Sequence, residues 1–199
     1  FGASLDKIKQ VVDVRDGEIM FGLNMVVHKG KTIFVGDTSV HEYPTSEQMA
    51  EIAISTARVV RLFGFDPKVA FVSHSTFGQP LTSRTKHIRN AVDILKQKKV
   101  DFEFDGDMQP DVALNPEYKD LYPFSKIVGK ANILIMPGQH SAAISYKMMK
   151  TLGDTKVIGP LLIGLGLPIE IAPLRSSTSE LINLASIAAY SADVIDYKK

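Results

Sequence analysis

The chain has no cysteine among its 199 residues. This absence excludes thiol catalysis, zinc–thiolate and iron–sulfur sites, and disulfide crosslinks. It fits a reducing compartment, and we expect a cytoplasmic protein. Because a chain of this length can bury about 70% of its unfolded surface in one core, folding needs neither a disulfide nor a structural metal.

A strong charge of one sign and long apolar runs are lacking as well. Lys and Arg number 23 against 22 Asp and Glu, a formal charge of +1. This balance argues against a broad nucleic-acid surface, although local anion sites stay open. The longest apolar runs, 131–137 and 158–167, fall short of the about 18 residues that a membrane helix needs. We therefore expect no membrane span.

The first residue is Phe1, and the segment after it has no signal-peptide layout. We therefore expect the sequence to be an excised piece or a processed product, whose function depends partly on residues outside it.

Segments with strand and helix patterns alternate along the chain. Residues 19–28 and 32–36 predict two strands joined by a hairpin turn at Gly30. Such alternation predicts an α/β fold with a mostly parallel sheet between two helical layers, where ligands collect at the carboxyl ends of strands. The remaining predicted strands are 68–73, 100–104, 132–136, 156–159 and 169–171, and the predicted helices are 45–64, 82–99, 141–152 and 178–195.

Two helices carry informative patterns. Thr45 and Gln48 form a capping-box pattern at the start of the first long helix, and Gly64 suits its end. The last helix is apolar on most of its circumference. We expect other elements or a partner chain to bury it.

A polar segment, Ser73-His74-Ser75-Thr76, follows the predicted strand 68–73. It suits either a ligand loop or an ordinary polar strand end. Adjacent residues in an extended segment point to opposite sides, so His74 is a poor acid–base partner for Ser73 or Ser75.

Basic residues gather at the start of the second long helix, where the helix dipole disfavours positive charge. Arg84 and Lys86 are the clearest of them. Two interpretations stay open: a solvated surface, or a phosphate held by these side chains and the free backbone N–H groups.

The acidic residues of 101–111 resemble a metal site, but their spacing matches no calcium loop and favours a turn at Asp105-Gly106-Asp107. Residues 137–141 link a strand to a helix. There a glycine permits close backbone approach, and His140 and Ser141 can point into the crevice. The segment lacks both common glycine-rich nucleotide motifs.

Five stretches carry a resemblance when they are taken in order: 34–54, 67–78, 100–116, 131–149 and 157–171. They resemble the phosphate acetyltransferase family. The likeness is greater to the phosphotransacetylase-type domain at the C-terminus of large bacterial NADP-dependent malic enzymes. The resemblance implies a three-layer αβα fold, phosphate acetyltransferase-like and isocitrate/isopropylmalate dehydrogenase-like, whose mostly parallel sheet carries a β-hairpin.

The resemblance also divides the chain. It implies that residues 1–199 are a fragment of such a domain. Residues 1–30 would form a lead-in segment with the first hairpin strand, residues 31–155 the main α/β subdomain, and residues 156–199 the closing strands and C-terminal helix.

The family's catalytic serine–arginine pair and aspartate align with Pro173, Leu174 and Glu180. A proline and a leucine can neither donate the hydrogen bond nor neutralise phosphate. Arg175 could substitute if the loop is shifted by one residue. Glu180 also completes a capping box that begins at Ser177.

We therefore expect the chain to have lost acetyl transfer and to keep an acetyl-CoA pocket. The resemblance implies a regulatory and oligomer-forming module, a homodimer or larger, through which acetyl-CoA inhibits malate decarboxylation. Two alternatives stay open: an active phosphate acetyltransferase, which converts acetyl-CoA and phosphate to acetyl phosphate and CoA, or a purely structural dimerisation module. The expected pocket residues are Ser75, Thr76, Arg84, Lys86, His140, Ser141, Arg175 and Ser176.

No metal site is expected in this chain. NADP and a divalent Mg or Mn ion are expected only in the malic-enzyme domains of the parent chain.

Overall fold

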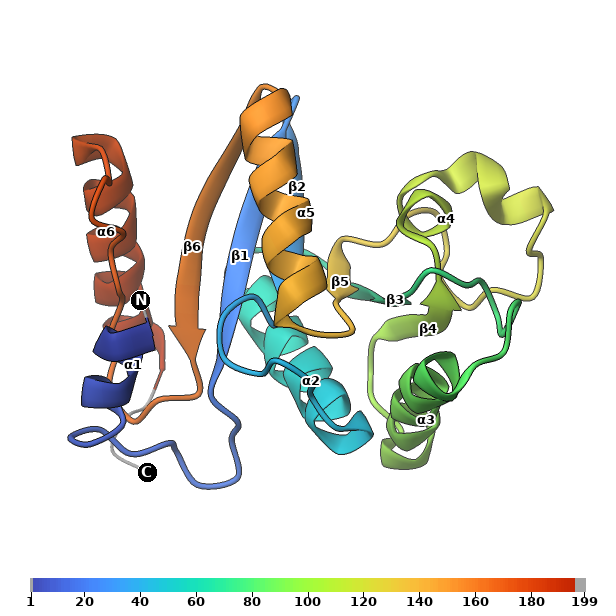
Figure 1. Cartoon of the computed structure of the whole chain (residues 1–199), viewed down its shortest axis with the longest axis horizontal. Coiled ribbons are helices and arrows are strands. Elements are labelled where there is room, and N and C mark those ends of the chain that lie inside the picture. The colour runs from blue at the N-terminus through green and yellow to red at the C-terminus, as the bar shows by residue number, and fades with distance from the viewer. Residues whose placement is uncertain (1, 196–199) are drawn as a thin grey trace.

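The structure is a computed structural model, which describes residues 2–195 (Figure 1). Helices and strands alternate along most of the chain, as the sequence pattern predicts. The elements are α1 (Gly2–Ile8), β1 (Phe21–His28), β2 (Lys31–Gly36), α2 (Ser46–Leu62), β3 (Lys68–Val72), α3 (Ser83–Lys98), β4 (Glu103–Met108), α4 (Pro110–Leu114), the 3₁₀ helix η1 (Pro116–Asp120), β5 (Ile133–Ile135), α5 (Gln139–Leu152), β6 (Thr155–Ile163) and α6 (Thr178–Val194).

The strands form one mixed sheet in the order β4-β3-β5-β2-β1-β6. β4, β3, β5 and β2 pair in parallel, whereas β1 pairs antiparallel with both β2 and β6. The predicted mostly parallel sheet with a hairpin is therefore confirmed. At the β6 edge the strand carries Pro160, and next to it Leu161 forms a single bridge to Glu170.

Helices cover both faces of the sheet, which confirms the three-layer prediction (Figure 1). Alternate strand residues point to opposite faces. Phe34, Phe71 and Ile133 therefore pack with α2 and α3, whereas Val35 and Ala70 pack with α4 and α5. Both faces of the central strands are buried, as is typical of a parallel sheet.

The first long helix begins where the sequence predicts. The Thr45 hydroxyl accepts the Gln48 N–H at 3.2 Å, and the Gln48 side chain accepts the Thr45 N–H at 2.8 Å. The helix ends before Gly64, whose φ of +81° is the left-handed conformation that glycine adopts at low cost. The capping box therefore fixes this start.

The predicted turn at Asp105-Gly106-Asp107 is wrong. These residues lie inside β4, which begins at Glu103, three residues after the predicted start at residue 100, and continues to Met108. Asp105 is 8% exposed and Asp107 is 0% exposed. Because their carboxylates accept hydrogen bonds from the chain, a strand with an acidic sequence can be buried here.

Two further expectations near the C-terminus are corrected, the second in part. The predicted strand 169–171 is reduced to the bridge between Leu161 and Glu170. The chain's own elements bury little of the last helix within the described residues, since Leu184 is its one buried side chain there, and burial by a partner chain stays a prediction. The large apolar side chains that α6 leaves exposed are Leu181, Ile182, Tyr190 and Val194.

The longest described helices, α2 and α6, have 17 residues each. A helix needs about 20 apolar residues to cross a bilayer. Within residues 2–195, no helix has both the length and the apolar character for such a crossing.

Replacing a core leucine should destabilise the fold strongly. Leu95 of α3 is 0% exposed. We expect Leu95→Ala to lower the free energy of unfolding by about 3–5 kcal/mol, because it removes buried methyl groups and leaves a cavity. The matched control is Leu152→Ala, a helical leucine that is 81% exposed and should change stability by less than about 0.5 kcal/mol. Urea unfolding measures both, and equal losses would contradict the placement of the core.

Candidate functional site

The loops after β2 and β5 meet at the carboxyl edge of the parallel strands. The Gln139 N–H donates to the His41 carbonyl at 3.1 Å, and the Gln139 side chain donates to the Ser39 carbonyl at 3.3 Å. A Cβ on Gly138 would lie 2.3 Å from the Glu42 carbonyl oxygen, so only glycine permits this approach. The glycine expected to allow close approach does so toward the protein's own backbone.

A buried carboxylate organises the loop that follows β2. Asp37 is 1% exposed. Its Oδ1 accepts the N–H groups of Gly22, Ser39 and Val40 at 2.8–3.1 Å, and its Oδ2 accepts the His41 N–H at 2.7 Å. The His41 Nδ1 lies 2.7 Å from the same oxygen. Sequence reasoning missed Asp37. The one sequence signal that could have found it is its position as an acid directly after a buried strand.

A second buried carboxylate, Asp107, holds the polar loop that follows β3. It accepts hydrogen bonds from the Ser75 hydroxyl and, at 3.0 Å, from the Gly78 N–H. The Thr76 hydroxyl accepts the Gln109 N–H at 3.2 Å. The expected ligand groups of Ser75 and Thr76 are therefore engaged inside the protein. His74 is exposed while Ser75 is buried, as expected for neighbours that point to opposite sides.

The other candidates from the strand-end loops are spread over the surface. Arg84 lies with its guanidinium carbon 5.8 Å from the centre of the Tyr43 ring, and Lys86 is exposed on α3. His140 is largely exposed, with Nε2 3.8 Å from Glu42 Oε1. The Ser141 hydroxyl donates to the Gly138 carbonyl at 2.8 Å. None of these four residues lines the cavity between α5, β6 and the start of α6 that is described next.

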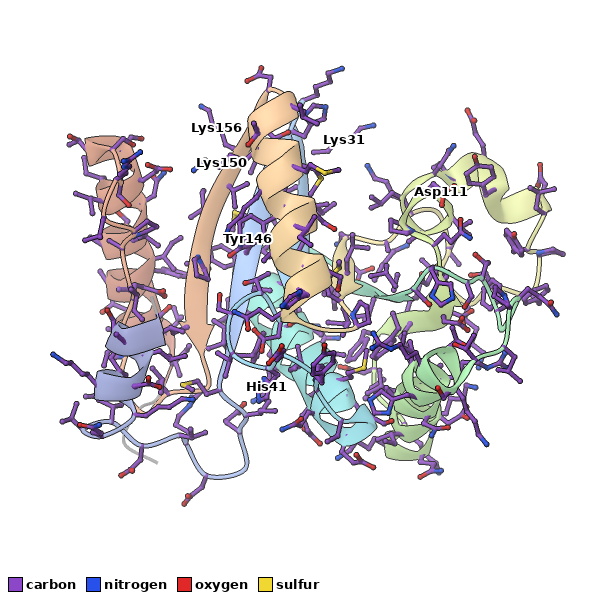
Figure 2. All side chains as sticks on the ribbon, viewed as in Figure 1. Lys31, His41, Asp111, Tyr146, Lys150 and Lys156 are labelled. Atoms are coloured by element: carbon purple, nitrogen blue, oxygen red, sulfur yellow. The ribbon has the colours of Figure 1, made fainter. Side chains whose placement is uncertain are left out.

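A cavity of about 540 Å³ opens between α5, β6 and the start of α6. We call it the α5–β6–α6 cavity. Lys147, Lys150 and Lys156 line it, together with Tyr146, and Figure 2 shows Tyr146 and Lys150 on α5 beside Lys156 on β6. Lys147 and Lys156 form no ion pair among the residues the structure describes. The cavity is therefore electropositive.

Part of the segment that we expect to align with the family's catalytic loop lies at this cavity. Pro173, Ser176 and Glu180 line it, whereas Leu174 and Arg175 are exposed and outside its lining. The Ser176 Oγ is buried and has no hydrogen-bond partner within residues 2–195. The structure thus brings together three of the expected positions, and adds three lysines that sequence reasoning did not select. The one sequence signal that could have found these lysines is that Lys150 and Lys156 lie on either side of the turn between α5 and β6.

Glu180 has two roles at the cavity. The Ser177 hydroxyl accepts the Glu180 N–H at 3.3 Å, while Glu180 Oε2 accepts the Ser177 N–H at 2.8 Å, so the predicted capping box is present. Its Oε1 lies 2.9 Å from Lys150 Nζ. The Ser177 amide and then the Lys150 ammonium lower the pKa of Glu180 to about 2.

A second cavity of about 530 Å³ lies between α2, the end of β6 and α6, with mostly apolar walls. Glu170 lines it and accepts the Leu162 N–H at 3.0 Å. Burial raises the pKa of Glu170 to about 8, against the opposing effect of that hydrogen bond. This carboxyl group is therefore mostly protonated at neutral pH.

Residues 2–189 match the phosphate acetyl/butaryl transferase family, and the chain belongs to that family. It is 44% identical over 192 residues to the NADP-dependent malic enzyme of Rhizobium meliloti, covering 96% of this chain and 25% of that enzyme. It is 31% identical over 185 residues to the phosphate acetyltransferase of Bacillus subtilis, covering 92% of this chain and 57% of that protein.

Solved structures agree with this membership. A phosphotransacetylase from Streptococcus pyogenes superposes with a TM-score of 0.89 at 30% identity, covering 96% of this chain and 59% of that one. One from Staphylococcus aureus gives 0.85 at 27%, covering 95% and 59%. The expected likeness to the phosphotransacetylase-like C-terminal domain of malic enzymes is confirmed. The chain spans about a quarter of the malic enzymes that it matches.

Removing the charge of Asp107 should loosen the loop after β3. Asp107→Asn replaces one acceptor oxygen by an NH₂ group, which cannot accept from Ser75 or Gly78. We expect the free energy of unfolding to fall by about 1–3 kcal/mol in urea titrations, because a buried donor loses its partner. Asp154→Asn, at an exposed turn position, is the control and should be neutral. Equal stability of the two variants would contradict the role assigned to Asp107.

Glu170 should make stability depend on pH. Its folded pKa of about 8 lies above its unfolded value, so the folded state holds the proton more tightly. The contribution of protonated Glu170 to the free energy of unfolding is complete below the unfolded pKa of about 4.3. It is lost as pH rises toward 8. Glu170→Gln should flatten the decline in urea midpoint over this range. Glu117→Gln, an exposed glutamate, should keep the parent slope, and parallel profiles for parent and Glu170→Gln would contradict the assignment.

Proposed function

We propose that this chain is the phosphotransacetylase-like domain of an NADP-dependent malic enzyme, and that it binds acetyl-CoA in the α5–β6–α6 cavity. The observation that carries the proposal is the cavity itself: three lysines meet the segment that aligns with the family's catalytic loop. Coenzyme A carries several phosphate groups, and ammonium groups suit them through charge-assisted hydrogen bonds.

The same cavity supports binding without acetyl transfer. At the two positions aligned with the catalytic serine and arginine, Pro173 supplies no donor and Leu174 is exposed and apolar. Loss of one oxyanion donor alone costs roughly 10²–10³ in rate. Arg175, which follows Leu174 and could replace the lost arginine if the loop is shifted by one residue, is exposed and outside the lining.

In this proposal acetyl-CoA is an allosteric effector of malate decarboxylation by the other domains of the parent chain, which would hold NADP and a divalent Mg or Mn ion. An effector must bind two states with different affinity, so binding alone is insufficient. The exposed apolar side chains of α6 support contact with a further surface, either in a homo-oligomer or on the parent chain. The parent would act in the cytoplasm.

Replacing Lys147 by methionine should weaken acetyl-CoA binding by about tenfold, because a charged hydrogen bond to phosphate is lost. Lys86→Met is the matched control, since it removes the same charge from α3, away from the cavity. Calorimetry on the full-length protein measures both dissociation constants. A loss with Lys86→Met and none with Lys147→Met would favour the strand-end loops over the cavity.

Two activity assays separate the alternatives. We expect no acetyl-CoA to form from acetyl phosphate and CoA, and turnover at ordinary enzyme rates would establish an active acetyltransferase. We expect acetyl-CoA to change malate-dependent NADPH formation. If acetyl-CoA binds but does not change NADPH formation, the cavity is a ligand site without a regulatory role. If acetyl-CoA does not bind, the third alternative, a purely structural dimerisation module, is favoured.

A further inference from the structure

Lys150 and Glu180 face one another across the lining of the α5–β6–α6 cavity. Lys150 belongs to the last turn of α5 and Glu180 to the first turn of α6, and their Nζ and Oε1 atoms lie 2.9 Å apart. Both residues line the cavity. One of the three cavity lysines is thus already neutralised by an acid of the protein itself.

The same carboxylate holds the start of α6. Glu180 Oε2 accepts the Ser177 N–H at 2.8 Å and the Ser177 hydroxyl at 3.0 Å. With a pKa of about 2, Glu180 stays ionised at every physiological pH. Lys150 is therefore tied, through one permanently charged group, to the cap of α6.

We propose that Glu180 is an internal competitor for Lys150, which a ligand phosphate must displace before it can use that lysine. This inference rests on the proposed function, because the ligand is the phosphate-bearing acetyl-CoA. It assigns regulation to the cavity: occupancy breaks the ion pair that links α5 to the start of α6.

The ion pair has the strength that such an exchange needs. The Lys150 side chain is 51% exposed and that of Glu180 is 36% exposed. An ion pair with this exposure changes the ratio of paired to unpaired states by a factor of only about 1.4–5. A phosphate brings more charge and several acceptor oxygens, so it competes effectively for the same ammonium group.

The rest of α6 is held independently of this pair. Leu184 packs in the main core, and the Tyr190 hydroxyl donates to the Leu62 carbonyl of α2 at 3.1 Å. Release of Lys150 therefore acts on the first turn of α6 while its later turns stay docked. This first turn carries Leu181, which belongs to the exposed apolar face of α6. Occupancy of the cavity therefore affects a surface that suits contact with another protein surface.

Glu180→Gln tests the competition directly. Glutamine keeps an acceptor for the Ser177 N–H, as a capping box allows, but removes the charge that holds Lys150. We expect acetyl-CoA to bind the full-length variant about two- to fivefold more tightly than the parent in calorimetry. Glu51→Gln is the control: it makes the same charge change in the Lys98–Glu51 pair at 2.8 Å, outside the cavity, and should leave affinity unchanged.

A double variant separates competition from a general charge effect. Lys150→Met should weaken binding, and Glu180→Gln should bring no gain when added to it. A full gain in the double variant, or equal affinity of Glu180→Gln and the parent, would overturn the competition while leaving the acetyl-CoA site intact. If neither the parent nor Glu180→Gln binds acetyl-CoA, the proposed function fails together with this inference.

Discussion

Buried carboxylates that accept backbone N–H groups are the constraint on which the loop structure depends. Asp37, which follows β2, accepts hydrogen bonds from four such N–H groups, and Asp107 fixes the loop after β3. Each acid uses the acceptor capacity that would otherwise need water or a ligand. The strand-end edge, where an α/β protein usually binds ligands, is here occupied by the protein's own hydrogen bonds. The electropositive cavity lies elsewhere, between α5, β6 and α6.

Periodicity and capping were sufficient to predict most elements. The 3.6-residue repeat and the Thr45 capping box placed α2 to within a residue or two, and alternation of strands and helices predicted the layers. These signals are local, because one turn of helix or one strand carries them. The resemblance in ordered segments supplied the family, which the matches over nearly the whole chain confirm.

Features that depend on distant partners were missed or misplaced. The Asp-Gly-Asp pattern predicts a turn, because the distant segments that donate hydrogen bonds to its carboxylates cannot be recognised from the local sequence. The three cavity lysines are unremarkable in sequence, because their convergence requires α5, β6 and α6 to pack together. Ser75 and Thr76 were selected for their position after a strand. Position alone does not reveal that their hydroxyl groups are already used inside the fold.

Pro160 on β6 limits how this edge of the sheet can pair with another strand. The strand lies at an open side of the sheet, where unpaired N–H and C=O groups invite growth by another chain. A proline offers no N–H to an incoming strand, and the neighbouring Leu162 N–H is already capped by Glu170. Pairing with another strand is thereby disfavoured along the part of β6 that contains Pro160 and Leu162.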